Sequence, residues 1–179
     1  MADDREVWKR ISQGDAKAFD AFYRENAPRL HAFLRQVVGN PQAAEDVAQD
    51  TFTQIWNRPN GFEPERGTLR AYVFGIGRKR AAEWWRKQSP YDAEAKDEPG
   101  TCKTETSSIV GDAFRRLPEE QRILLWLREV EGQSYTELAG ILNIPVGTVR
   151  SRLFAARNAL RNIWQSTPKD SEGGRHDVQ

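Results

Sequence analysis

The stretch SYTELAGILNIPVGTVRSRLF, residues 134–154, decides how part of this chain folds. Ser134 and Glu137 have the spacing of a capping box, in which each side chain accepts a hydrogen bond from the backbone N–H of the other residue. The helix that they begin is short and ends before Asn143, and another helix follows from Pro145. Two helices joined by so brief a turn form a helix-turn-helix, whose second helix usually enters the major groove of DNA.

The second helix of this motif is basic. No acidic residue lies between Leu138 and Pro168. Its helical spacing predicts a core stripe of Val149, Leu153, Ala156, Leu160 and Trp164. Away from that stripe lie Thr148, Arg150, Ser151, Phe154 and Ala155. The alternative is a small helical bundle with a solvated basic face, but the capping box, the turn length and the charge together favour DNA binding.

The rest of the chain is divided into short amphipathic helices. Asp15 and Asn40 are placed as N-caps, and Gly39 ends the first of these helices. The spacing of apolar residues predicts helices over residues 16–38, 41–56, 69–87 and 118–131. No segment alternates apolar and polar residues, so we predict an all-α fold.

Residues 89–107 separate two groups of helices. They contain two prolines, five acids and almost no large apolar residue beyond Tyr91. Such a segment buries too little apolar surface to offset its ordering entropy, so we predict a flexible acidic linker. Two small helical domains follow from this division, residues 1–88 and 108–166, with a disordered tail over 167–179.

The composition excludes several classes of protein. No run of about 20 apolar residues exists, and the start of the chain is polar, so we expect neither a membrane-spanning protein nor a secreted one. Cys102 is the single cysteine and His31 and His176 are the only histidines, which leaves no internal disulfide and no zinc ligand set. We therefore expect a cytoplasmic protein without a metal or a cofactor.

The helix over residues 69–87 is the second basic element. It carries Arg70, Arg78, Lys79, Arg80, Arg86 and Lys87 against a single acid, Glu83. Cations interleaved with aromatic residues suit single-stranded DNA, in which bases stack on rings and phosphates pair with cations. By position, Tyr72 and Trp84 are predicted to belong to the core and Trp85 to be exposed. Arg80 interrupts the apolar stripe.

The helix over residues 41–56 is acidic instead. Glu45, Asp46 and Asp50 share it with several glutamines. An acidic face seldom contacts DNA, so this face is either simply solvated or docks on a basic protein surface.

Four motifs, in order along the chain, carry a resemblance to a known family. They are AEDVAQDTF (44–52), LRAYVFGIGR (69–78), GQSYTELA (132–139) and PVGTVRSRL (145–153). Together they closely resemble the extracytoplasmic-function (ECF, group IV) sigma factors of bacterial RNA polymerase. The resemblance covers about residues 7–164 and places the linker where the family has one.

The resemblance implies an alternative sigma factor that binds core RNA polymerase, directs it to −35 and −10 promoter elements and helps to melt the DNA. It implies a sigma-2 domain that docks on the polymerase clamp, a sigma-4 domain near the flap, and an anti-sigma factor as a further partner. For contact with the −35 element it implies Thr148, Arg150, Ser151, Arg152, Phe154 and Arg157. For capture of the −10 element it implies Phe62, Arg66, Arg78, Lys79, Glu83, Trp85 and Arg86. For polymerase docking it implies Asp46, Gln49, Asp50, Phe52, Gln54 and Trp56.

Three residues depart from the family pattern. Lys79 replaces a usual Asn, Glu83 a common Asp and Ala155 a frequent Arg, which we expect to alter promoter preference.

Two other classes of protein are alternatives to a sigma factor. A free-standing dimeric helix-turn-helix regulator would leave the acidic helix and the basic helix over residues 69–87 unexplained. A nucleic-acid enzyme would need a metal-carboxylate cluster, a phosphate loop or a nucleophile with its base, and we expect neither enzymatic activity nor a small-molecule substrate.

Overall fold

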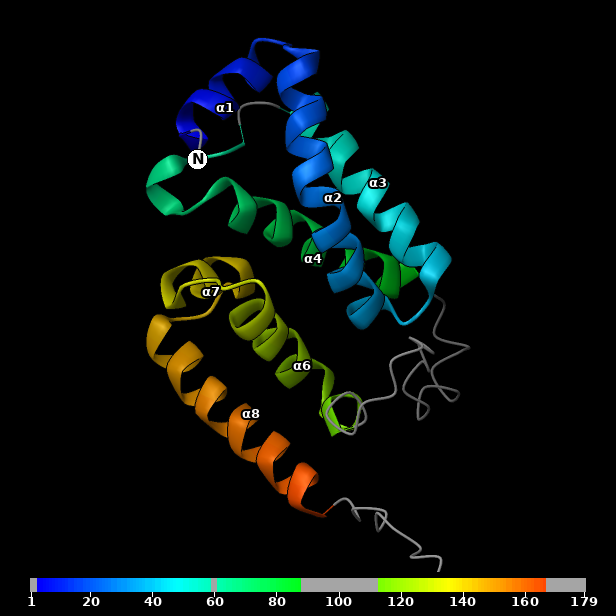
Figure 1. Cartoon of the computed structure of the whole chain (residues 1–179), viewed down its shortest axis with the longest axis vertical. Helices are drawn as coiled ribbons and strands as arrows, with labels where there is room; N and C mark the ends of the chain where they lie inside the picture. The colour runs from blue at the N-terminus through cyan, green and yellow to red at the C-terminus, as the bar shows by residue number, and fades with distance from the viewer. Residues whose placement is uncertain (1–2, 59–60, 88–112, 167–179) are drawn as a thin grey trace, which may run out of the picture.

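The structure is a computed structural model that describes residues 3–58, 61–87 and 113–166. Within these ranges it is helical and contains no strand, which confirms the all-α prediction (Figure 1). The elements are α1 (Asp4–Ser12), α2 (Ala16–Val38), α3 (Pro41–Asn57), the 3₁₀ turn η1 (Pro64–Arg66), α4 (Leu69–Lys87), α6 (Glu119–Leu125), the π-helical turn η3 (Trp126–Val130), α7 (Tyr135–Leu142) and α8 (Val146–Ser166). The predicted linker over 89–107 and tail over 167–179 lie outside the described residues.

The predicted helix ends of the N-terminal half are confirmed. The Asp15 side chain accepts hydrogen bonds from the backbone N–H groups of Lys17 and Ala18, both at 3.0 Å, and so caps α2. Gly39 ends the same helix with a φ of 72°, a left-handed conformation that glycine adopts without steric cost. Asn40 caps α3 through the backbone N–H of Ala43. Local capping chemistry thus determines where these helices begin and end.

Helix α1 was not predicted from the sequence. Asp3 caps it, and Trp8 and Ile11, one helical turn apart, are its buried residues. The Trp8 ring meets the rings of Phe62 and Tyr72 edge-on, with centroids 5.4 and 5.6 Å away. The helix is only nine residues long, and its packing against a distant loop supplies much of the reason for it to form.

Helices α2, α3 and α4 form the core of the N-terminal half (Figure 1). Leu30, Phe33 and Phe74 are completely or almost completely buried, and the last two rings pack edge-on at 5.2 Å. Gly77 permits this packing, since a Cβ at its position would lie 2.7 Å from Leu30 Cδ1. No such crowding surrounds Gly75, where a Cβ would meet nothing within 4 Å.

The C-terminal half is the predicted helix-turn-helix. The capping box of Ser134 and Glu137 begins α7, and Asn143 ends it in the left-handed conformation with a φ of 54°. Val149, Leu153 and Ala156 of α8 are buried as predicted, and Leu160 is half-buried. The prediction was wrong for Trp164, which is 40% exposed. It lies at an open groove of about 560 Å³ shared with Leu125 and Leu160 rather than inside the core.

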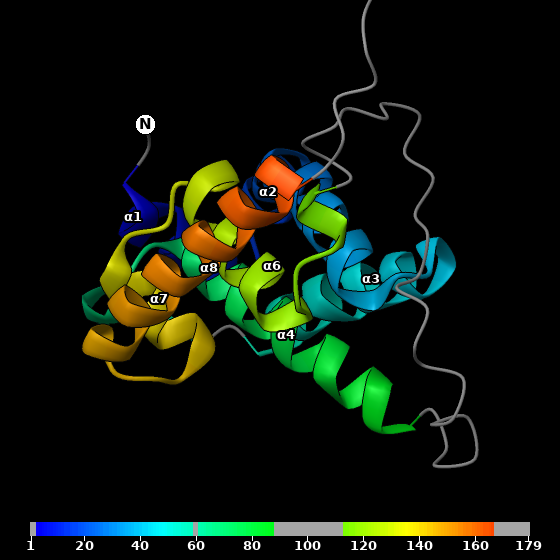
Figure 2. The ribbon, with the colours of Figure 1, turned by 90° about the horizontal axis from the view of Figure 1, so that it is seen from below.

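The two halves are in contact. Helix α7 packs on α4, and α6 lies beside α2, so α4 is placed between the N-terminal helices and the helix-turn-helix (Figure 1). Seen from below, the C-terminal end of α4 extends beyond α6, α7 and α8 (Figure 2). None of the helices in the described ranges combines the length and apolar character that crossing a membrane requires.

Candidate functional site

The outward face of α8 joins cations to an exposed aromatic ring. Arg150, Ser151, Arg152 and Arg157 are exposed, and Phe154 is 69% exposed. Thr148 is half-buried at the start of the helix. An exposed phenylalanine beside exposed cations suits a surface that contacts bases or thymine methyl groups.

Acids from the neighbouring helices position two of these arginines. Arg152 pairs with Glu120 at 3.4 Å, and Arg157 donates to Glu129 at 2.6 and 3.1 Å. The hydrogen bonds to Glu129 raise the pKa of Arg157, a side chain that is already charged at neutral pH. The Arg150 guanidinium instead lies 6.0 Å from the ring centroid of Tyr135. The guanidinium of Arg128 lies nearer to the same ring, at 5.0 Å, so Arg150 lies beside a ring that a second cation also faces.

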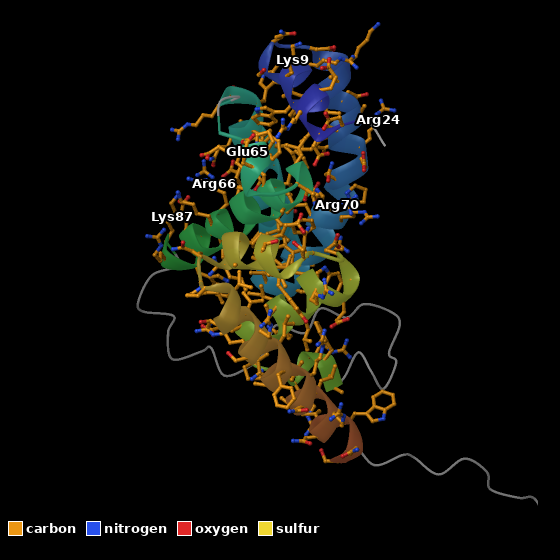
Figure 3. The ribbon with its side chains drawn as sticks, turned by 90° about the vertical axis from the view of Figure 1, so that its left-hand side faces the viewer. Lys9, Arg24, Glu65, Arg66, Arg70 and Lys87 are labelled. Carbon is orange, nitrogen blue, oxygen red and sulfur yellow. The ribbon has the colours of Figure 1, made fainter. Side chains whose placement is uncertain are left out.

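The loop before α4 is anchored from inside. Phe62 is buried between Trp8 and Tyr72, so its ring supports the loop and does not face solvent. Arg66 is exposed and pairs with Glu63 at 2.8 Å. Its side chain projects from the same edge of the molecule as Lys87, while Arg70 lies at the opposite edge (Figure 3).

The basic residues of α4 fall into two groups. Lys79 and Arg86 are exposed. Arg80 is half-buried, where it donates to Gln54 of α3 at 2.9 Å and to Glu83 at 3.1 Å. These bonds explain why a cation interrupts the apolar stripe of this helix. Glu83 therefore accepts a hydrogen bond from Arg80 within the fold, independently of any contact with DNA.

Two residues of α4 are less exposed than the sequence suggests. The prediction that Trp85 is exposed was wrong, because its side chain is half-buried. Its ring meets that of Trp84 edge-on, with centroids 4.8 Å apart, and its indole N–H donates to the carbonyl of Val37 at 3.4 Å. Arg78 is also half-buried, and its guanidinium donates to the carbonyl of Ile141 in α7 at 3.0 Å. Helical periodicity does not reveal these neighbours, because both lie far away along the chain.

Helix α3 presents its acidic face to solvent. Asp46, Gln49 and Asp50 are all exposed and lie within one helical turn of one another. Gln54 is half-buried and accepts the bond from Arg80. Behind the acidic face, Phe52 is buried and Trp56 is 39% exposed. An open groove of about 490 Å³ runs beside these two residues and is lined by both, together with Phe19, Tyr23, His31, Glu45, Gln49 and Thr53.

The contacts between the two halves were missed from the sequence. The hydroxyl of Thr68 donates to Glu137 in α7, and Arg29 of α2 lies 3.5 Å from the carboxylate of Glu131. Burial alone would raise the pKa of Glu137, but the hydrogen bonds from Thr68 and Ser134 outweigh it and hold that pKa below its ordinary value. No local pattern marks these pairs, since each joins residues that are far apart in sequence.

The described residues present charged surfaces rather than a cluster of metal ligands. Among residues 3–58, 61–87 and 113–166, no group of three or more His, Cys, Asp or Glu side chains is arranged to hold a metal ion. Two basic faces that suit DNA and one acidic face that suits a protein are on the molecule instead.

Comparison with known proteins decides the family. The model of Sigma-70 region 2 matches residues 22–91, and that of Sigma-70 region 4 matches residues 107–160. The ECF RNA polymerase sigma-E factor of Haemophilus influenzae is 30% identical over 184 residues, which cover 90% of this chain and 95% of that protein. The chain belongs to the ECF sigma factors of RNA polymerase. The resemblance stated from the four sequence motifs is thereby confirmed.

Other relatives agree with this membership. The RNA polymerase sigma-H factor of Pseudomonas aeruginosa is 28% identical to this sigma factor, over 90% of this chain and 94% of that one. The sigma factor RpoE of Bartonella quintana, solved in complex with the anti-sigma factor NepR, superposes with a TM-score of 0.69 at 26% identity, over 86% of this chain and 100% of that one. The structure of CnrH in complex with the cytosolic domain of CnrY has the same TM-score at 24% identity, over 92% and 99% of the two chains, and supports the fold.

Proposed function

We propose that this sigma factor docks on core RNA polymerase through α3 and reads promoters with two separate basic surfaces. The observation that carries the proposal is the separation of charge. The acidic face lies on α3, whereas the cationic faces lie on two other helices, α4 and α8. Helix α8 is the second helix of the helix-turn-helix. DNA binding alone gives no role to an acidic face, whereas docking on a basic protein surface does.

We assign each of the three surfaces to the part of the promoter or of the polymerase that it contacts. The α8 face, through Arg150, Ser151 and Phe154 with flanking Thr148, Arg152 and Arg157, reads the −35 element. The loop and α4, through Arg66, Arg78, Lys79 and Arg86, hold the −10 strand, and Phe62, Glu83 and Trp85 act from within the fold to shape that surface. The α3 face of Asp46, Gln49 and Asp50, backed by Phe52, Gln54 and Trp56, meets the clamp.

The same proposal assigns the rest of the chain. Residues 1–88 form the sigma-2 domain, 89–107 the acidic linker, 108–166 the sigma-4 domain that also meets the flap, and 167–179 the tail. The protein works in the cytoplasm as an initiation factor without enzymatic activity of its own. An anti-sigma factor is its further partner, because RpoE of Bartonella quintana is solved with one.

The test combines this protein with bacterial core RNA polymerase that lacks its own sigma factor. Transcripts from a template library of genomic fragments are sequenced from their 5′ ends. We expect discrete start sites preceded by one shared pair of promoter elements, and none with core polymerase alone. Absence of specific starts, together with absence of a complex on gel filtration, would contradict the proposal and favour a free-standing regulator, which duplex DNA binding by the protein alone would then reveal.

A further inference from the structure

Helix α1 has no assignment in the proposed function, yet it contacts both ends of the loop that precedes α4 (Figure 1). This loop, residues 62–68, contains η1, and we call it the −10 loop. At one end, the Trp8 ring packs edge-on against that of Phe62, with centroids 5.4 Å apart. At the other end, the Asp4 carboxylate accepts the backbone N–H of Leu69, the first residue of α4, at 2.7 Å.

Two acceptors share the start of α4. The Thr68 hydroxyl accepts the backbone N–H of Ala71 at 3.2 Å and is a local cap, whereas Asp4 lies 65 positions before the residue whose N–H it accepts. The first N–H groups of a helix lack partners within the helix, and a carboxylate at that end also interacts favourably with the helix dipole. The point at which the −10 loop ends and α4 begins therefore depends in part on α1.

Trp8 completes a cluster of three rings beside the −10 loop. Its ring lies 5.6 Å from that of Tyr72 in α4, and the rings of Phe62 and Tyr72 are also 5.6 Å apart. Trp8 and Phe62 are each only 8% exposed. Asp4 and Trp8 are four residues apart, so they lie on the same face of α1. We call Asp4 and Trp8 the α1 anchor.

The α1 anchor leaves the polar side chains of the −10 loop on the surface. Phe62 at its start and Leu69 just after its end are buried. The exposed residues between them are Glu63, Glu65, Arg66 and Thr68. Arg5 also reaches Glu65 at 3.1 Å, but both side chains are exposed, and such surface ion pairs contribute little. The buried contacts of Asp4 and Trp8 are thus the ones that hold the loop.

A loop that is already ordered favours capture of a flipped base. Taking a base out of the stack costs free energy, which the receiving surface must offset. A loop that became ordered only on binding would lose conformational entropy in the same step. Because the α1 anchor holds both ends beforehand, the exposed side chains are presented in one arrangement. All these contacts lie within the N-terminal half, so they are independent of the helix-turn-helix.

We propose that Asp4 and Trp8 are positioning residues for the −10 loop, which contact no DNA themselves and determine how sharply the loop discriminates between bases of the −10 element. This inference rests on the proposed function for the identity of the bound DNA. The ordering of the loop by α1 is a property of this chain alone. Specificity at the −10 element should then depend on α1, whereas specificity at the −35 element should not.

Competition between promoters tests the role toward DNA. Holoenzyme is assembled from core RNA polymerase and each full-length variant, and it transcribes a promoter found by start-site sequencing together with copies substituted at one −10 or one −35 base. We expect Asp4→Ala and Trp8→Ala to reduce the preference for the original −10 sequence several-fold and to leave the −35 preference unchanged. Lys9→Ala, at an exposed position of α1, is expected to change neither preference.

Conservative variants separate positioning from general stability. Asp4→Asn keeps an acceptor oxygen and Trp8→Phe keeps a ring, so we expect both to retain most of the −10 preference. The measured preference is a ratio of transcripts from two templates in one reaction. A variant that only folds less well lowers both transcripts and leaves this ratio unchanged.

Amide hydrogen exchange tests the anchoring without DNA or polymerase. In Asp4→Ala and Trp8→Ala we expect the amides of residues 62–69 to exchange several-fold faster than in the parent protein. The amides of α3 and α8 are expected to keep their rates. Asp4→Asn is expected to exchange at the rates of the parent protein throughout.

The alternative outcomes are distinct. Unchanged exchange over residues 62–69 in both alanine variants would show that α1 does not hold the loop. Faster exchange with an unchanged −10 preference, or an equal loss of preference at both elements, would show that anchoring does not serve base discrimination. If exchange accelerates as expected but the parent protein uses no promoter with core polymerase, the proposed function fails, and with it the role toward DNA, while the anchoring of the loop by α1 stands.

Discussion

At the scale of single residues, Arg80 joins two helices of the N-terminal half. Its guanidinium is bonded to Gln54 of α3 and to Glu83 one turn along α4, and its side chain is 35% exposed. We expect Arg80→Ala to lower the free energy of unfolding by about 1–3 kcal/mol, because charged hydrogen bonds and the packing of the alkyl stem are lost together. Urea denaturation measures this change.

The neighbouring residue supplies the control. Lys79 is exposed on the same helix, and Lys79→Ala is expected to change the free energy of unfolding by less than about 0.5 kcal/mol. Equal effects of the two substitutions would mean that the bonds of Arg80 contribute no stability beyond that of a surface cation.

Arg150 is the residue for which direct reading of a base is most sharply testable. It is exposed on α8 and rests near the ring of Tyr135. Arg150→Ala is expected to cost about 1–3 kcal/mol at one base pair of the −35 element and to relax specificity there. The measurement is transcription from a set of promoters mutated singly across that element. An equal loss on every promoter would instead indicate a phosphate contact.

At the scale of elements, the boundaries of α2, α3 and α7 could be predicted because they depend on neighbours in sequence. A capping side chain reaches a backbone N–H two or three residues away, so Asp15, Asn40 and Ser134 were recognisable without any tertiary information. Helix α1 was missed because its two buried residues gain their packing from a distant loop and from α2 and α4.

In the candidate surfaces, too, features that depend on sequence neighbours could be predicted, whereas contacts with residues far away along the chain could not. The exposed cations of α8 and acids of α3 could be predicted, since they lie opposite an apolar stripe. The burial of Phe62 and the hydrogen bonds of Arg78 and Trp85 could not be predicted. Helical periodicity shows that one face of a helix is covered, but it does not show which element covers that face. These residues contact Trp8, Ile141 and Val37, all far away along the chain.

The turn of the helix-turn-helix depends on one backbone conformation. Asn143 has a φ of 54°, which asparagine and glycine tolerate and β-branched residues do not. We expect Asn143→Val to lower the free energy of unfolding by about 1–3 kcal/mol and to misplace α8, with loss of promoter-specific transcription. Asn143→Gly is the matched control and is expected to retain both. Equal stability of the two variants would mean that the turn can relax to another conformation.

Helix α3 is the element that separates the sigma-factor proposal from other uses of the fold. Asp50 is exposed, so its substitution should leave the core intact. Asp50→Arg is expected to abolish co-purification with core RNA polymerase through like-charge contact with a basic partner surface, while the urea midpoint is unchanged. Glu6→Arg, an equal charge change at an exposed position of α1, is expected to keep polymerase binding. Retained binding by Asp50→Arg would move the docking site elsewhere.

At the scale of the whole molecule, contact between the halves should depend on pH through Glu137. The hydrogen bonds from Thr68 and Ser134 hold its pKa below the ordinary value of 4.5 despite burial. A carboxylate with a lowered pKa binds fewer protons in the native protein than in the unfolded chain, so its contribution is fully present well above pH 4.5. That contribution is lost as the pH falls through the lowered pKa.

We therefore expect the distance between spin labels at Thr53→Cys on α3 and Asn162→Cys on α8, placed in protein with Cys102→Ser, to lengthen as the pH is lowered through this window. In Glu137→Gln, which keeps the capping box but cannot ionise, the distance should not change with pH there. Asp15→Asn removes a carboxylate whose pKa is lowered by the N–H of Ala18 and by Arg10, both in the N-terminal half, so its label distance should follow the parent. A pH-dependent distance in Glu137→Gln would assign the titration to another group. Identical, flat profiles in all three proteins would mean that Glu137 does not control contact between the halves.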